Sequence, residues 1–354
     1  MPLETTRYDI DPEQAERSAL REAGLRYVSC NDKGYSRITQ GKDVVYIDQN
    51  GRSITNERIL ARIRSLVLPP AWTNVWICAS PNGHLQATGL DTKGRKQYKY
   101  HPKWASLRSE KKFATLLDFG KQLPQLQKKI ERDLRKKRWD RDKVCALALA
   151  IMDKTSFRSG NRSYEKENGS FGLTTLRNKH AKPVSAHKIF FKFVGKKGVL
   201  QQTYLAEKKL VNMLLKVREI PGQRLFQYYD GYGEVRQLES GDLNMYLKDA
   251  MCLDVTCKSF RTWNGCVLAL AHLTMLPLAV NQVQRKKNTL AVIDRVAEAL
   301  GNTRAVTRSH YIHPALLTAY EEGRLDRWIR DCNRKETPPT TERLKKRLFS
   351  LLSQ

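Results

Sequence analysis

Residues 96–107, with the sequence KQYKYHPKWASL, mark the point where the chain changes from strand periodicity to helical periodicity. Up to Tyr100 the side chains alternate with a period of two, which is typical of a β-strand with two different faces. Around His101 and Trp104 the pattern becomes helical, and from Glu110 the chain is charged and helical. We therefore expect an α+β protein, with a small β-rich domain in residues 1–107 and a mainly helical domain in residues 108–354.

Upstream of this point the sequence predicts short strands and one helix. The dipeptide Asn50-Gly51 indicates a hairpin turn between residues 44–47 and residues 53–54. Thr55 can cap a helix over residues 56–66, which the Pro69-Pro70 pair would stop. Glycine-containing turns separate three further expected strands, at residues 75–79, 84–88 and 96–100.

Downstream the sequence predicts helices interrupted by one hairpin. The apolar helix 143–155 should deliver Arg158 to a turn at Gly160. Strands at 189–194 and 199–205 flank the four-residue tip GKKG, a strong hairpin signal. A polar helix should run through residues 164–167, and others over residues 243–251 and 288–300 and from Pro314. The charged tail from about residue 324 is expected to form a helix and a loose end.

The charge of the chain favours a polyanionic partner. Its 354 residues hold 64 Lys and Arg against 36 Asp and Glu, a formal net charge of +28. Such an excess is more typical of nucleic-acid binding than of membrane binding, although it is also compatible with a simply solvated basic surface. The longest apolar stretch, residues 266–280, is shorter than a membrane span and contains Pro277, so we interpret it as a buried helix.

The N-terminal residues and the cysteines bear on the cellular location and the redox state of the protein. The first nine residues contain no apolar segment of a secretory signal, so we expect a cytoplasmic protein. The seven cysteines are odd in number and form no Cys-x-x-Cys pair, which predicts reduced, mostly packed thiols rather than a metal site or disulfides.

A second stretch, residues 301–314 with the sequence GNTRAVTRSHYIHP, surrounds Tyr311 with cationic and imidazole groups. It contains no acid and four such side chains: Arg304, Arg308, His310 and His313. Most tyrosines are packing residues, and that interpretation of Tyr311 stays open here. A phenol in this setting could also ionise and attack a phosphodiester.

Five side chains, four of them next to a helix end or turn, together fit phosphoryl transfer to a tyrosine: Arg158, Lys196, Arg261, Asn302 and Tyr311. Two guanidiniums and an amide can stabilise the charge that develops on nonbridging phosphate oxygens. A lysine with a lowered pKa can protonate the leaving alkoxide. The sequence near these segments shows no acidic cluster suited to Mg²⁺, so we expect no metal and no cofactor.

The strand at residues 96–100 admits two interpretations. Tyr98 and Tyr100 share one face, while Gln97 and Lys99 share the other. This alternation suits a nucleic-acid surface, since Gln can contact a base edge and Lys a phosphate. It equally suits an edge strand protected by charge.

Several sequence runs, in their order along the chain, resemble those of the type IB DNA topoisomerases, in particular the small poxvirus and bacterial branch. The likeness covers residues 25–320 and rests on the runs PPAWTNVWI (69–77), GHLQATG (83–89), GRKQY (94–98), GLTTL (172–176), KFVGK (192–196) and KSFRTW (258–263).

The resemblance implies a clamp of the two domains around duplex DNA and a reversible 3′-phosphotyrosyl link that relaxes supercoils without ATP. It implies that Tyr311 is the nucleophile, Arg158 and Arg261 stabilise the transition state, and Lys196 is the general acid. It also implies a monomer without an obligate protein partner, associated with the nucleoid. The DNA-contacting residues that it implies are Gln97, Tyr98 and Tyr100 on the strand, and Tyr164 and Glu167 on a major-groove helix.

One position departs from the family pattern, and two rival functions remain. Poxvirus and nuclear members place His where this chain has Asn302, so an amide donor replaces an imidazole donor. A site-specific tyrosine recombinase shares the chemistry, but recombinases typically have His-x-x-Arg where this chain has Lys258-x-x-Arg261. A non-catalytic DNA-packaging protein would explain the charge but would not need Tyr311 or Lys196.

Overall fold

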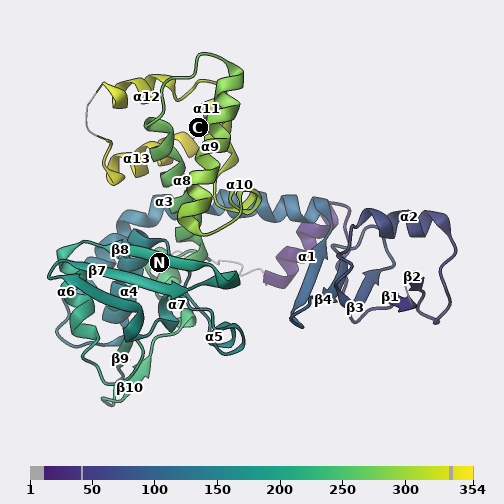
Figure 1. The fold of residues 1–354 in the computed structure, drawn as a ribbon, viewed down its shortest axis with the longest axis horizontal. Helices are drawn as coiled ribbons and strands as arrows, with labels where there is room; N and C mark the ends of the chain where they lie inside the picture. The colour runs from purple at the N-terminus through teal and green to yellow at the C-terminus, as the bar shows by residue number, and fades with distance from the viewer. Residues whose placement is uncertain (1–11, 41–42, 335–337, 354) are drawn as a thin grey trace, which may run out of the picture. The chain divides into compact units, whose positions relative to one another are not determined.

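The computed structural model describes residues 12–40, 43–334 and 338–353, which form two compact units. The units comprise residues 1–112 and 113–354, and this division and the expected boundary at residue 107 both lie inside helix α3 (Pro102–Leu134). Each unit is described separately below, and Figure 1 shows the elements of both.

The first unit is built on one antiparallel sheet with the strand order β2-β1-β3-β4-β5. Helix α2 (Glu57–Ser65) packs on this sheet through Ile63, which is buried with Val75, Ile77 and Ala87 (Figure 1). A further helix, α1 (Pro12–Glu22), precedes the sheet. The strands are β1 (Gly34–Gln40), β2 (Asp43–Ile47), β3 (Thr73–Cys78), β4 (Leu85–Leu90) and β5 (Lys96–Tyr100).

The predicted hairpin in this unit is only partly right. Across the Asn50-Gly51 turn, Ile47 pairs with Ser53 in a single isolated bridge, so the second arm is not a strand. The long partner of β2 is β1, which the sequence did not predict. The helix cap was also wrong by one residue: Asn56, not Thr55, accepts hydrogen bonds from the first turn of α2. The amide side chain reaches two backbone N–H groups there, which is what a cap requires.

The first part of the second unit combines helices with a small antiparallel sheet. Helix α4 (Arg141–Thr155) lies in the middle, and its residues from Val144 to Leu149 are fully buried. The antiparallel sheet has the order β6-β7-β8, and β7 and β8 form the predicted hairpin. The remaining elements here are α5 (Arg162–Asn168), β6 (Ala181–Ser185), β7 (Lys188–Val194), β8 (Leu200–Leu205), α6 (Lys208–Val217), β9 (Gln227–Tyr229), β10 (Val235–Gln237) and α7 (Ser240–Met251).

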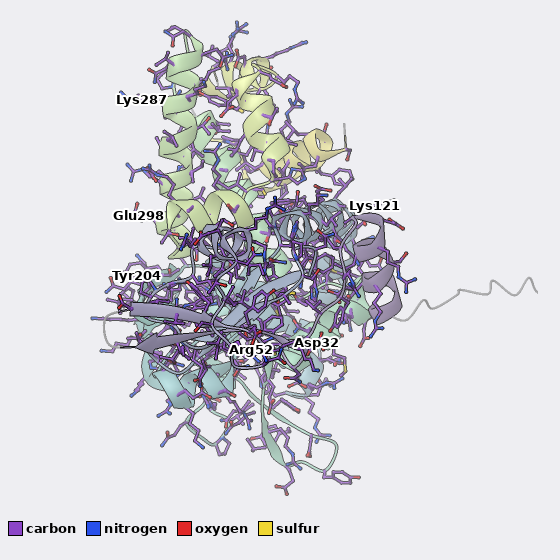
Figure 2. The ribbon with its side chains drawn as sticks, turned by 90° about the vertical axis from the view of Figure 1, so that its right-hand side faces the viewer. Asp32, Arg52, Lys121, Tyr204, Lys287 and Glu298 are labelled. Carbon is purple, nitrogen blue, oxygen red and sulfur yellow. The ribbon has the colours of Figure 1, made fainter. Side chains whose placement is uncertain are left out.

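Six helices complete the second unit and share one apolar core with α4. Charged side chains such as Lys287 and Glu298 lie exposed along α9 (Figure 2), while its other face is buried. These helices are α8 (Cys257–Thr274), α9 (Gln282–Leu300), α10 (Arg304–His310), α11 (Pro314–Glu321), α12 (Asp326–Asn333) and α13 (Thr341–Leu352).

Two predictions about this region need correction. The apolar stretch 266–280 is a buried helix only as far as Thr274, and Val280 beyond Pro277 is exposed. The tail does not end loosely, because α13 buries Leu344, Leu348 and Leu351 in the core. Their spacing of four and three residues is the signature of an amphipathic helix, which the high charge of the tail concealed.

No helix in the described part of the chain is long and apolar enough to cross a membrane.

Candidate active site

Tyr311 lies where α10 ends, directly before the turn into α11. Its backbone N–H donates to the Thr307 carbonyl at 2.9 Å, so the last turn of the helix holds the Tyr311 backbone in place. The residue is 8% exposed and joins the edge of the apolar core. Its backbone lies against α8 at Gly265, where a Cβ atom would be 2.4 Å from the Tyr311 carbonyl oxygen. Glycine therefore permits the close approach that brings this tyrosine to α8.

Arg261 on α8 is buried next to the phenol of Tyr311. Its guanidinium carbon lies 5.3 Å from the centre of the Tyr311 ring. Backbone carbonyls hold the guanidinium: Nη1 donates to Ser156 O at the end of α4, and Nη2 donates to Leu300 O at the end of α9, 2.7 Å away. Burial and the nearby charge of Arg158 lower the pKa of Arg261 to about 10, so it stays protonated near neutral pH. Both of these acceptors are backbone carbonyls, and within the described residues no acidic side chain accepts from this guanidinium.

Arg158 extends from the loop that follows α4. The helix ends at Ser156, which has a left-handed conformation with φ 54°. Gly160, with φ 102°, then lets the loop pass close to Gly172, where an added Cβ would lie 2.5 Å from the Gly160 backbone. The Arg158 carbonyl accepts from Leu173 N–H at 2.8 Å. Gly160 therefore has a positive φ that favours glycine, but the residues around it form no hydrogen-bonded turn, and the Arg158 carbonyl is held by Leu173.

Asn302 lies at the end of α9, where Arg158 contacts its side chain and Arg261 contacts the neighbouring Leu300 carbonyl. Gly301 ends the helix in a left-handed conformation, as expected of a C-cap, and Asn302 follows it. The Asn302 Oδ1 accepts from Arg158 Nη2 at 2.7 Å. Its Nδ2 is buried and has no partner among the described atoms, and the same is true of Arg261 Nε. Buried donors without acceptors are costly, so each of these two N–H groups would gain from an acceptor such as an anion.

Lys196 occupies the tip between β7 and β8. The tip closes with a hydrogen bond from Gly195 N–H to Val199 O at 2.8 Å, and Lys197 adopts a left-handed conformation at φ 63°. Partial burial of the Lys196 ammonium and the positive charge of Arg158 lower its pKa, although the side chain is exposed overall. The tip therefore brings Lys196 close enough to Arg158 for their charges to interact.

The phenol of Tyr311 is electrostatically poised to ionise. Burial alone would raise its pKa, but the charges of Arg261 and Arg158 outweigh burial and hold the pKa below the usual value for tyrosine. Lys258, one helical turn before Arg261, also lowers the pKa of Tyr311 and that of Lys196. In the sequence, Lys258 separated two enzyme families, and its contribution to these pKa values was not predicted. Its spacing of three residues from Arg261 on a helix was the available signal.

All five predicted catalytic side chains thus meet in the second unit, and the predicted DNA-contacting residues divide between the units. In the first unit Tyr98 and Tyr100 share a face as expected, with ring centres 6.1 Å apart. Gln97 lies on the opposite side, where its Nε2 donates to Asp91 at 2.9 Å. Tyr164 and Glu167 in the second unit are exposed on α5.

No group of three or more His, Cys, Asp or Glu side chains within the described ranges is placed to hold a metal ion. None of the seven cysteines forms a disulfide, and five of them are buried: Cys78, Cys145, Cys257, Cys266 and Cys332.

Comparison with known proteins connects this site to one family. Residues 101–328 match the family described as eukaryotic DNA topoisomerase I, catalytic core, and residues 44–91 match the bacterial DNA topoisomerase IB N-terminal domain. The chain is 32% identical to DNA topoisomerase 1B of Acanthamoeba polyphaga mimivirus, over 82% of this chain and 88% of that protein. It is 24% identical to DNA topoisomerase 1B of vaccinia virus, over 65% of this chain and 70% of that protein. The chain therefore belongs to the type IB DNA topoisomerases, and it is an enzyme of that family.

Proposed function

We propose that this enzyme relaxes supercoiled duplex DNA by cutting and rejoining one strand through a covalent link to Tyr311. One observation carries the proposal: the Tyr311 phenol lies beside two guanidiniums, Arg158 and Arg261, at a site where two buried donors lack acceptors. A packing tyrosine would not need either feature. A phosphodiester oxygen at this position would accept from Arg261 Nε and Asn302 Nδ2.

In the proposed cleavage step, the Tyr311 phenolate attacks phosphorus and the bond to the 5′ oxygen breaks. The DNA 3′ end then carries a phosphotyrosyl ester, and the departing 5′ oxygen takes a proton from the Lys196 ammonium. The charge that develops on the nonbridging oxygens is stabilised by Arg158, Arg261 and the Asn302 amide. The lowered pKa of Tyr311 favours the phenolate that attacks, and the lowered pKa of Lys196 makes its ammonium a stronger proton donor.

Rejoining is the reverse of cleavage in this scheme. The free 5′ hydroxyl attacks the phosphotyrosine after the cut strand has rotated, and Lys196 recovers its proton. Because the ester conserves the energy of the phosphodiester, the cycle needs no ATP. The cationic side chains and the Asn302 amide stabilise the phosphate charge, so the chemistry needs no metal ion. The Asn302 amide donates a hydrogen bond but, unlike a protonated His, adds no positive charge.

Duplex DNA is the proposed substrate, and its binding involves both units of a monomer acting as a clamp. Stacked, exposed Tyr98 and Tyr100 offer apolar faces, and Gln97 lies on the same strand. On α5, Tyr164 and Glu167 are free of the core and could reach base edges in the major groove. We place the enzyme in the cytoplasm at the nucleoid, where its substrate is.

The deciding experiment incubates purified enzyme with negatively supercoiled plasmid in EDTA and without nucleotide. We expect relaxation by the wild type and none by Tyr311→Phe, which removes one oxygen and should stay folded and DNA-bound. Wild type denatured during turnover should carry DNA 3′ ends on the peptide that contains Tyr311. Strict dependence on Mg²⁺, or relaxation by Tyr311→Phe at the wild-type rate, would contradict the proposal. Recombination only at paired sites, or binding alone, would support the rival functions.

A further inference from the structure

The turn that ends α4 is held by side chains from two other helices. Its left-handed residue, Ser156, lies two positions before Arg158. From α8, Arg261 Nη1 donates to Ser156 O, while Asn264 Nδ2 donates to Asp153 O at 2.8 Å and to Ser156 Oγ at 3.2 Å. A non-glycine residue in this conformation is strained and persists only where its surroundings enforce it.

The second contribution comes from the C-terminal helix α13. Lys345 Nζ contacts both carboxylate oxygens of Asp153, at 3.0 and 3.4 Å, across 192 positions in the sequence. Lys345 is 8% exposed, whereas Glu342, its other acidic neighbour at 3.9 Å, is exposed. A lysine this deeply buried is uncommon unless it is paired. Asp153 is therefore the close partner that explains why Lys345 points inward.

We propose that Lys345 is a positioning residue for cleavage, which acts through Asp153 to fix the turn that presents Arg158. The inference rests on the proposed function, because it takes Arg158 to be a catalytic group. By holding the last turn of α4, the ion pair keeps the Ser156 turn in the geometry that directs Arg158 toward Asn302 and Tyr311. Lys345 thereby connects the C-terminal helix to the placement of Arg158.

A purely stabilising role explains the ion pair less well. Leu344, Leu348 and Leu351 already attach α13 to the core by apolar burial. A buried ion pair typically adds little net stability compared with apolar side chains of similar size. In contrast, catalysis is sensitive to small displacements, and a shift of about 1 Å can cost roughly 100-fold in rate. Precise placement of Arg158 is the benefit that the pair can supply.

The test compares Lys345→Met with Lys346→Met in single-turnover cleavage of a duplex by excess enzyme. Lys346 is the exposed neighbour on the same helix and controls for the loss of one positive charge. We expect Lys345→Met to slow cleavage at least about tenfold with DNA affinity within about twofold of wild type, because only placement is disturbed. Lys345→Arg, which keeps the charge, should recover most of the rate. Cleavage by folded Lys345→Met at the rate of the Lys346→Met control would overturn the proposal.

Asp153→Asn provides a second test that does not depend on burying a new side chain. It should slow cleavage as Lys345→Met does, and the double variant should be no slower than either single variant, since both break one interaction. Additive losses would contradict the coupling. Thermal denaturation checks that each variant is folded at the assay temperature, and if Lys345→Met is not, the Asp153→Asn comparison decides alone.

A modified substrate separates positioning from general weakening of the fold. Replacing a nonbridging oxygen by methyl removes the charge that Arg158 would neutralise, so the penalties of Lys345→Met and Arg158→Ala should shrink together on that substrate. If the loss of cleavage rate shrank for Arg158→Ala but stayed unchanged for Lys345→Met, the role of Lys345 would be contradicted and the proposed function would not. An Arg158→Ala variant that cleaves normal DNA at the wild-type rate would instead contradict the proposed function.

Discussion

At the scale of single residues, the structure places Lys196 and Tyr311 in different surroundings. Lys196 lies at an exposed hairpin tip with a lowered pKa, as suits a proton donor, whereas Tyr311 is buried against Arg261. If Lys196 protonates the leaving oxygen, Lys196→Ala should slow cleavage by about 100-fold or more, within the usual range for general acids. Replacing the leaving 5′ oxygen by sulfur should restore the rate, since a thiolate leaves without a proton.

The same sulfur substrate should not rescue Tyr311→Phe, because no nucleophile remains. Cleavage by both variants on both substrates is measured by denaturing gel, so that each variant serves as the control for the other. If sulfur failed to rescue Lys196→Ala, that residue would lose its assigned role, and Tyr311 would keep its own.

Lys258 offers a residue-scale prediction about pH. Its charge contributes to the lowered pKa of Tyr311, where Arg261 contributes more, and of Lys196, where burial and Arg158 contribute more. The nucleophile is active when deprotonated and the acid when protonated, so the cleavage rate should rise through the first pKa and fall above the second. Lys258→Met removes one cation from both groups and should raise both pKa values. Both limbs of the profile should therefore move to higher pH.

Single-turnover rates over a range of pH at saturating enzyme would measure this shift. Lys346→Met, whose side chain lies on α13, serves as the charge control and should leave both limbs in place. An unchanged profile for Lys258→Met would show that the charge at this position does not act on either group.

At the scale of elements, the close approach of α8 to the Tyr311 backbone should be sensitive to one methyl group. A Cβ at Gly265 would lie 2.4 Å from the Tyr311 carbonyl oxygen, so Gly265→Ala must displace backbone. We expect a loss of about 1–3 kcal/mol in the free energy of unfolding and a slower cleavage step. Gly241→Ala on α7, where no atom lies within 4 Å, should change neither property much. Equal effects of the two substitutions in denaturant titrations and cleavage assays would contradict this account.

The elements also show which parts of the fold the sequence could predict. Strand β5, the β7–β8 hairpin and α4 were predicted because each combines a clear periodicity with turn or cap residues. Strand β1 was missed because its sequence, GYSRITQ, has few apolar residues, and its hydrogen bonds to β2 and β3 on both sides define it instead. Strand β6 was missed because Pro183 argues against a strand, yet it is tolerated at an edge of the sheet.

For the candidate site, too, the sequence predicted some features and not others. Arg158, Arg261 and Tyr311 were predicted from their local settings and the family resemblance, since each lies on or beside a helix end or a recognisable motif. The burial of Asn302 Nδ2 without a partner in the described part of the chain, and the contact of Lys345 with Asp153, depend on packing between helices far apart in sequence. No local pattern carries such information.

At the scale of the whole molecule, the net charge of +28 should govern how tightly DNA binds, while the buried site should govern how fast it is cut. Cationic side chains that neutralise phosphates release counterions, so the logarithm of the binding constant should fall linearly with that of salt, by roughly 0.9 per phosphate contact. In the proposed mechanism Arg158 and Arg261 act on bound DNA from largely buried positions, where salt screens their charges weakly.

We therefore expect a steep salt dependence of DNA affinity together with a nearly salt-independent rate of cleavage at saturating enzyme. Affinity is best measured with Tyr311→Phe, which cannot form the covalent link and so reports noncovalent binding alone. The wild-type enzyme supplies the cleavage rates over the same range of sodium chloride. A flat affinity would contradict a clamp that surrounds DNA with Lys and Arg. A cleavage rate that fell as steeply as the affinity would mean that the arginines beside Tyr311 are solvated in the complex, and the electrostatic account of the phenolate would have to be abandoned.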